Sequence, residues 1–126
     1  DISRYLTREK RPAQQHIWMR ATGRLPDAFP LHQCVLAYAS DMTPIDTVLG
    51  RHETTMFDPT LMMASLDHSV WFHRPFQADD WLLYAQASPS AAKARGLTFG
   101  HIFSRSGDLV ASVAQEGLIR RRREMP

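Results

Sequence analysis

The sequence predicts an α+β domain in which an antiparallel sheet wraps around one central helix. A run with alternating apolar residues comes first, and the apolar pattern then takes a helical period from Leu31. Four further strand-like runs follow with no other long helical run. A helix that is apolar on most sides has to be covered, and the strands are the elements available to cover it.

The composition is that of one globular domain. The chain has 126 residues, of which 44% are hydrophobic and 22% are charged, with a formal net charge of +2. One cysteine leaves no internal disulfide, so we expect a reducing, cytoplasmic location. No apolar run reaches about 18 residues, and no charged-then-apolar leader occurs, so we expect neither a membrane span nor a signal peptide. Basic and aromatic residues do not alternate along one strand, so nucleic acid is not an expected partner.

Residues 1–13 are charged and aperiodic, which predicts a linker before a domain over 14–121 and a tail over 122–126. The alternation over 14–22 predicts a first strand that ends at a turn containing Gly23. Pro30 suits the first turn of a helix, and the apolar spacing predicts that helix over about 31–42.

Pro44 cannot continue the main helix. Thr43 before it is a good N-cap, which predicts a short second helix that ends near Leu49. Residues 52–58 are then expected to form a loop. The remaining strands are predicted over 60–74, 81–91, 95–105 and 109–120, with Ser106, Gly107 and Asp108 as the last hairpin turn.

Two residues of the main helix stand out. Cys34 lies in the apolar stripe and is predicted to be a small buried core residue. Asp41 lies in the same stripe at the end of the helix, where the helix dipole disfavours a carboxylate. Asp41 is therefore either a functional residue, or a cap or arginine partner with a structural role.

The stretch over 65–76, most of which lies in the strand predicted over 60–74, carries more polar residues than a packing strand needs. Ser65, Asp67, Ser69 and His73 share one phase of the expected alternation, and His68 lies in the other. In the last strand, Gln115 is the only polar residue in its phase. A buried amide is either satisfied by backbone groups or presents its donor and acceptor to a pocket.

Several kinds of chemistry lack their sequence signals. The six histidines show no metal-binding spacing, and no glycine-rich phosphate loop or nucleophile elbow occurs. We therefore expect no metal and no organic cofactor.

Five segments together resemble the C-terminal half of the TesB-like acyl-CoA thioesterase II family: LAYASD (36–41), SLDHSVWFHRPF (65–76), DWLLY (80–84), ARG (94–96) and LVASVAQEG (109–117). The resemblance covers about residues 14–120. It implies a hotdog fold, a sheet wrapped around a helix, as one half of a double hotdog. It also implies hydrolysis of fatty acyl-CoA by a water molecule on which Asp41, Ser65 and Gln115 act together.

The resemblance further implies an acyl-CoA substrate and a second hotdog as partner, supplied by an N-terminal half or by another copy in a homo-oligomer. Arg95 and Arg105 are candidates for the CoA phosphates, and His68 is a candidate substrate contact. Two alternatives remain. One is a non-catalytic hotdog half that supports a partner or binds acyl-CoA. The other is a dehydratase or hydratase using His68 with Asp67, although adjacent strand residues face opposite sides.

Overall fold

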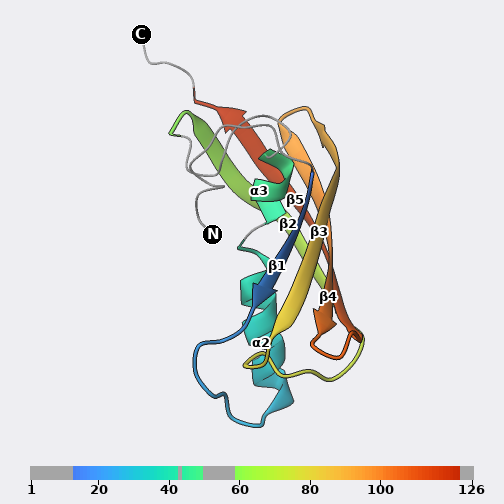
Figure 1. The fold of residues 1–126 in the computed structure, drawn as a ribbon. Coiled ribbons are helices and arrows are strands. Elements are labelled where there is room, and N and C mark those ends of the chain that lie inside the picture. The colour runs from blue at the N-terminus through green and yellow to red at the C-terminus, as the bar shows by residue number, and fades with distance from the viewer. Residues whose placement is uncertain (1–12, 43, 50–58, 123–126) are drawn as a thin grey trace.

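A computed structural model describes residues 13–42, 44–49 and 59–122. Its elements in chain order are β1 (Gln14–Met19), α2 (Phe29–Ser40), α3 (Pro44–Leu49), β2 (Leu61–Phe72), β3 (Leu82–Ala92), β4 (Arg95–Ser104) and β5 (Leu109–Arg121) (Figure 1). Residues 1–12 of the linker predicted over 1–13, the Thr43 cap and the loop over 52–58 lie outside the described residues.

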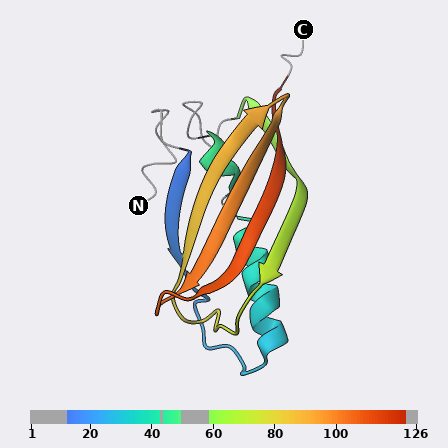
Figure 2. The ribbon, with the colours of Figure 1, turned by 90° about the vertical axis from the view of Figure 1, so that its right-hand side faces the viewer.

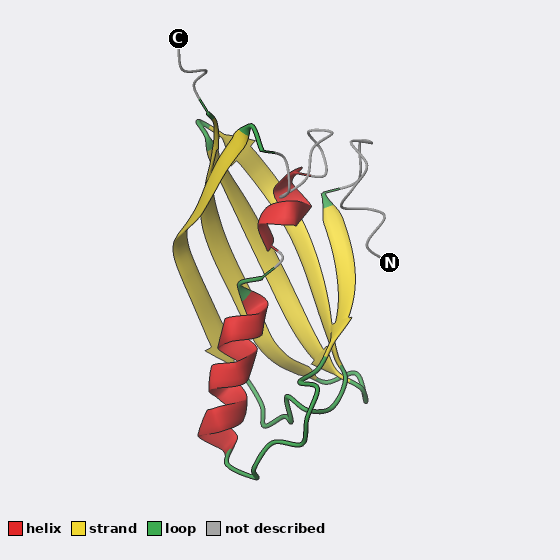
Figure 3. Ribbon diagram, turned by 90° about the vertical axis from the view of Figure 1, so that its left-hand side faces the viewer, coloured by secondary structure: helices red, strands yellow, loops and turns green. Residues whose placement is uncertain are grey.

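The strands form one sheet in the order β1-β3-β4-β5-β2, and every neighbouring pair is antiparallel. Figures 2 and 3 show that both helices lie on the same face of this twisted sheet, which we call the inner face. The arrangement confirms the predicted α+β architecture with its main helix after the first strand. Within the described residues, neither helix is long and apolar enough to cross a membrane.

The buried side of α2 differs from the predicted one. Its buried residues are His32, Leu36 and Ser40, whereas Cys34 is exposed, so the prediction of a buried Cys34 was wrong. The physical reason is that two polar residues occupy the buried stripe. The His32 ring accepts a hydrogen bond from the Ala78 N–H at 2.9 Å, and the Ser40 hydroxyl reaches other polar groups described below. Apolar spacing therefore marked the wrong side of the helix.

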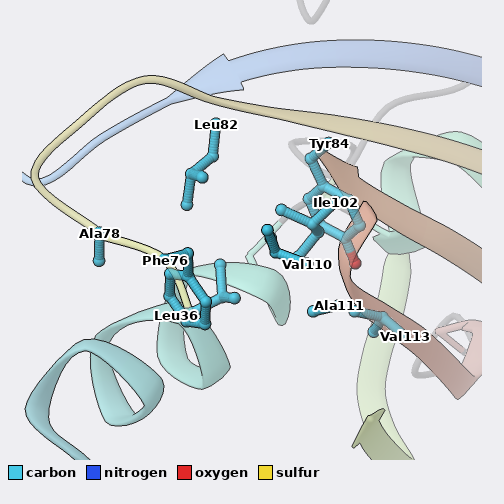
Figure 4. Packing of buried hydrophobic residues seen from close by; sticks show 9 residues of the cluster. All are labelled: Leu36, Phe76, Ala78, Leu82, Tyr84, Ile102, Val110, Ala111 and Val113. Atoms are coloured by element: carbon cyan, nitrogen blue, oxygen red, sulfur yellow. The ribbon is translucent and has the colours of Figure 1, made fainter. Parts of the chain in front are cut away.

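The hydrophobic core fills the space between α2 and the sheet (Figure 4). Phe76 anchors it at the end of the helix, with its ring edge-on to Phe29 at a centroid distance of 5.5 Å and stacked on Phe72 at 6.1 Å. The core residues are Leu36, Phe76, Ala78, Leu82, Tyr84, Ile102, Val110, Ala111 and Val113.

A β-bulge changes the phase of β2. Ser65 pairs with Gly117, but Asp67 pairs with Glu116, so Leu66 is an extra residue between the two pairs. The predicted shared phase of Ser65 and Asp67 was therefore wrong, because an extra residue turns the following side chains to the other face. Ser65 and His68 consequently share the inner face.

Two glycines let bulky groups approach the inner face of β4. A Cβ at Gly96 would lie 2.6 Å from a methyl carbon of Val48 in α3. A Cβ at Gly100 would overlap the ring of Tyr84, which is 1% exposed. The close contact between Tyr84 and β4 therefore depends on the absence of a side chain at Gly100.

We predict that Gly100→Ala destabilises the fold by about 1–3 kcal/mol, because the added methyl group overpacks the site beneath Tyr84. Gly23→Ala is the matched control, since nothing lies within 4 Å of a Cβ built at Gly23. Urea unfolding of the two variants measures the difference. Equal stability of the two would contradict the close packing of Tyr84 on Gly100.

Candidate active site

The side chain of Gln115 joins two residues that are distant in the sequence. Gln115 lies on the inner face of β5 and is 2% exposed. Its Nε2 donates one hydrogen bond to Asp41 Oδ1 and another to Ser65 Oγ at 2.9 Å. The structure thus brings together the three residues that the sequence singled out, from the end of α2, from β2 and from β5.

The chemistry of the partners fixes the orientation of this amide. An ionised carboxylate only accepts hydrogen bonds, so the group facing Asp41 has to be the NH₂ of Gln115. Both amide hydrogens are then used, one by Asp41 and one by Ser65. The other amide atom, Gln115 Oε1, is buried and accepts no hydrogen bond from the described residues. A buried acceptor in this state costs about 1–3 kcal/mol, so it calls for a donor.

The same reasoning leaves the hydroxyl hydrogen of Ser65 available for a further hydrogen bond. Because Ser65 Oγ accepts from the Gln115 amide, its own O–H points elsewhere and can donate. Ser65 and Asp41 are both exposed, in contrast to Gln115. Asp41 is the residue at the C-cap of α2, and no ion pair joins it to an arginine within the part of the chain that the structure describes.

Ser40, the residue before Asp41, is completely buried and bonded on several sides. Its hydroxyl donates to the carbonyl oxygen of Ala37 at 2.9 Å and lies 2.9 Å from Nε2 of His68. Its carbonyl oxygen accepts a hydrogen bond of 2.9 Å from the hydroxyl of Tyr84. Sequence reasoning missed Ser40 and Tyr84. The available signal was Ser40 itself, a polar residue four positions after Leu36 on the same side of the helix.

The surroundings of Tyr84 keep its phenol protonated. Burial is the larger cause and the negative charge of Asp41 the smaller, and both raise the pKa of Tyr84 above its ordinary value of 10.0. The Tyr84 hydroxyl therefore remains a hydrogen-bond donor to Ser40 at neutral and mildly alkaline pH.

The arginines predicted to bind phosphate lie apart from these residues. Arg95 pairs with Glu116 at 3.3 Å, and Arg105 pairs with Asp80 at 2.7 Å beside the β4–β5 hairpin. Their contact with CoA stays a prediction. Asp67 lies opposite Glu116, on the face of the sheet away from His68, so the acid–histidine pair of a dehydratase is not assembled. Among the described residues, no group of three His, Cys, Asp or Glu side chains is arranged to hold a metal ion.

Comparisons with known proteins identify the family and the fold. A family model for acyl-CoA thioesterases matches residues 3–118. The chain is 45% identical to acyl-CoA thioesterase 2 of Haemophilus influenzae over 111 residues, which are 88% of this chain and 39% of that protein. It is 44% identical to acyl-coenzyme A thioesterase 8 of Mus musculus over 108 residues, covering 85% of this chain and 33% of that protein.

Among solved structures, the acyl-CoA thioesterase II TesB2 of Mycobacterium marinum superposes with a TM-score of 0.78 at 47% identity, covering 92% of this chain and 44% of that one. The E. coli PaaI protein superposes with a TM-score of 0.66 at 16% identity, which supports the shared fold alone. These neighbours confirm the hotdog fold. The chain spans less than half the length of the TesB2 structure and of both curated relatives.

We predict that stability falls as pH rises above about 10, by up to about 1.4 kcal/mol per pH unit from Tyr84. The unfolded chain releases the Tyr84 proton near pH 10.0, whereas the folded chain retains it to higher pH. Stability therefore has its full value below that pH and is lost above it.

Urea unfolding between about pH 9 and 11 measures this dependence. Tyr84→Phe should flatten the curve, and Tyr38→Phe is the control because Tyr38 is 76% exposed. Identical curves for the two variants would contradict the raised pKa of Tyr84.

Proposed function

The chain belongs to the acyl-CoA thioesterase family, and from this premise we propose that it hydrolyses fatty acyl-CoA to free fatty acid and CoA. The reacting water is activated by Asp41 and positioned by Ser65 and Gln115. The observation that carries the proposal is the Gln115 amide, which donates to both Asp41 and Ser65 while its own oxygen still needs a donor.

A single water molecule matches the hydrogen-bonding groups that remain. Water has two hydrogens to give, and Asp41 and Gln115 Oε1 are two acceptors. Water also has two lone pairs, and the Ser65 O–H can donate to one of them. The second lone pair is then free to attack a carbonyl carbon. This count supports a water molecule held as a nucleophile.

The proposed reaction follows from these positions. As the water oxygen bonds to the thioester carbon, Asp41 accepts a proton from the water. Negative charge develops on the carbonyl oxygen and calls for a hydrogen-bond donor. When the tetrahedral intermediate collapses, the carbon–sulfur bond breaks, and the proton held by Asp41 passes to the departing sulfur. The products are a fatty acid and the CoA thiol.

We further propose that a second hotdog completes the site, either another part of a longer protein or another copy of this chain. β2 is twelve residues long, and among the described strands it pairs with β5 alone. An unpaired edge favours association. Apolar side chains adjoin Asp41 and Ser65 in the sequence: Tyr38, Met42 and Leu66 are 76%, 59% and 47% exposed. An apolar partner would cover them.

We predict that Asp41→Asn lowers turnover of acyl-CoA by about 10²- to 10⁴-fold, because the amide cannot accept the water's proton. Release of free CoA from a panel of acyl-CoAs measures the change. Asp67→Asn is the matched control, since this exposed carboxylate lies on the outer face and should leave turnover unchanged. A loss below about threefold for Asp41→Asn would remove Asp41 from the role of base.

We also predict that the chain associates in solution. Light scattering at micromolar concentration should give a mass of at least two chains, because pairing covers both the β2 edge and the exposed apolar residues. Leu66→Lys should weaken the association. Trp18→Lys is the control and should not, because Trp18 lies in β1 at the opposite edge of the sheet. A clean monomer for the unmodified chain would contradict pairing between copies.

A further inference from the structure

His68 is bonded to the residue before Asp41. The two partners are His68 Nε2 and Ser40 Oγ, 2.9 Å apart. The Ser40 hydroxyl hydrogen is already given to the carbonyl oxygen of Ala37, which only accepts. His68 must therefore be the donor, with a proton on Nε2. The hydrogen bond therefore runs from His68 on the sheet, the donor, to Ser40 on the helix, the acceptor.

Together these bonds fix the end of α2. Ser40 is held at its hydroxyl by His68 and Ala37, and at its carbonyl oxygen by Tyr84 from β3. Ser40 is the last residue of α2, and Asp41 follows it directly. Figure 3 shows that α2 extends beyond the strands at its other end, so its C-terminal end is the part held over the sheet.

His68 also lies close to the other two residues of the site. It lies on the same strand as Ser65 and pairs directly across the ladder with Gln115. The bulge at Leu66 gives His68 the inner-face orientation that lets it reach the helix. The hydrogen bond between His68 and Ser40 therefore links the end of α2, which Asp41 follows, to β2 and its neighbour β5, which hold Ser65 and Gln115.

We propose that His68 is a positioning residue that holds Asp41 in register with Gln115 and Ser65 by way of Ser40. The proposal rests on the thioesterase function proposed above. It differs from the substrate contact predicted from the sequence, because Ser40 already uses His68 Nε2. Displacing a catalytic group by about 1 Å can cost roughly 100-fold in rate. Loss of the His68–Ser40 hydrogen bond, one residue before Asp41, should therefore lower kcat more than it weakens substrate binding.

The test compares a variant that lacks the donor with one that keeps it. His68→Leu should lower kcat about 10- to 100-fold with little change in KM. His68→Gln places an amide donor at a similar reach and should restore kcat to within a few-fold. Ser40→Ala should resemble His68→Leu, and the double variant should be no worse than either single one, because both remove the same bond.

The chain offers a matched control. His73, the residue that follows β2, has its Nε2 2.8 Å from Ser112 Oγ of β5. This is also a histidine–serine bond, but Ser112 lies on the outer face of the sheet. His73→Leu should therefore leave kcat unchanged. Thermal unfolding of every variant separates loss of fold from loss of position.

A second measurement does not depend on activity. In the unmodified chain both side-chain amide hydrogens of Gln115 are bonded and should give distinct, slowly exchanging NMR signals. Well below the unfolding temperature, His68→Leu should broaden or shift these signals, and His68→Gln should restore them. Unchanged Gln115 signals together with unchanged kcat in folded His68→Leu would overturn the proposal.

The two proposals fail in different ways. If Asp41→Asn keeps the activity of the unmodified chain, the proposed function fails, while the Gln115 signals still report whether His68 sets the geometry. If Asp41→Asn is inactive and His68→Leu is fully active, the function stands and the role of His68 is refuted.

Discussion

The site depends on one buried amide that has two acceptors to satisfy. Gln115 gives one hydrogen to Asp41 and the other to Ser65, so a single side chain sets the distance between a helix end and an edge strand. A carboxylate could not replace it, because it has no hydrogen to donate. A hydroxyl has only one hydrogen. The amide alone offers two donors and one acceptor in a rigid plane, and its acceptor remains available for a further ligand.

The backbone supports this arrangement in two places. The bulge at Leu66 lets Ser65 and His68 face the helix from one edge strand, although three positions separate them and regular alternation would place them on opposite faces. At the end of α2, Ser40 accepts two hydrogen bonds, one at its hydroxyl from His68 of β2 and one at its carbonyl oxygen from the buried Tyr84 of β3. Asp41 is thereby held through its backbone from one side and through its carboxylate from the other.

Local patterns were enough to predict the fold, whereas the grouping of Asp41, Ser65 and Gln115 came from the family resemblance. Alternation and helical period predicted the elements, and Asp41 and Gln115 interrupt otherwise apolar patterns. The buried side of α2 could not be predicted in this way, because His32 and Ser40 are polar and are buried only through distant partners. The bulge at Leu66 could likewise not be predicted, because an extra residue in one strand is defined by its pairing with the partner strand. Sequence patterns therefore report local preference, whereas these two features depend on long-range hydrogen bonds.

The contrast in exposure within the site links its chemistry to assembly. Gln115 is 2% exposed, whereas Asp41 and Ser65 are exposed on the surface of this chain. A carboxylate that bulk water surrounds has many hydration partners, and charge stabilisation is weaker there than in a site that excludes solvent. The described residues set the positions of the polar groups but leave Asp41 and Ser65 exposed. Because apolar side chains flank Asp41 and Ser65 in the sequence, a partner that buries those side chains would also exclude bulk water from the site. Under the proposed function, association and catalysis therefore depend on the same surface.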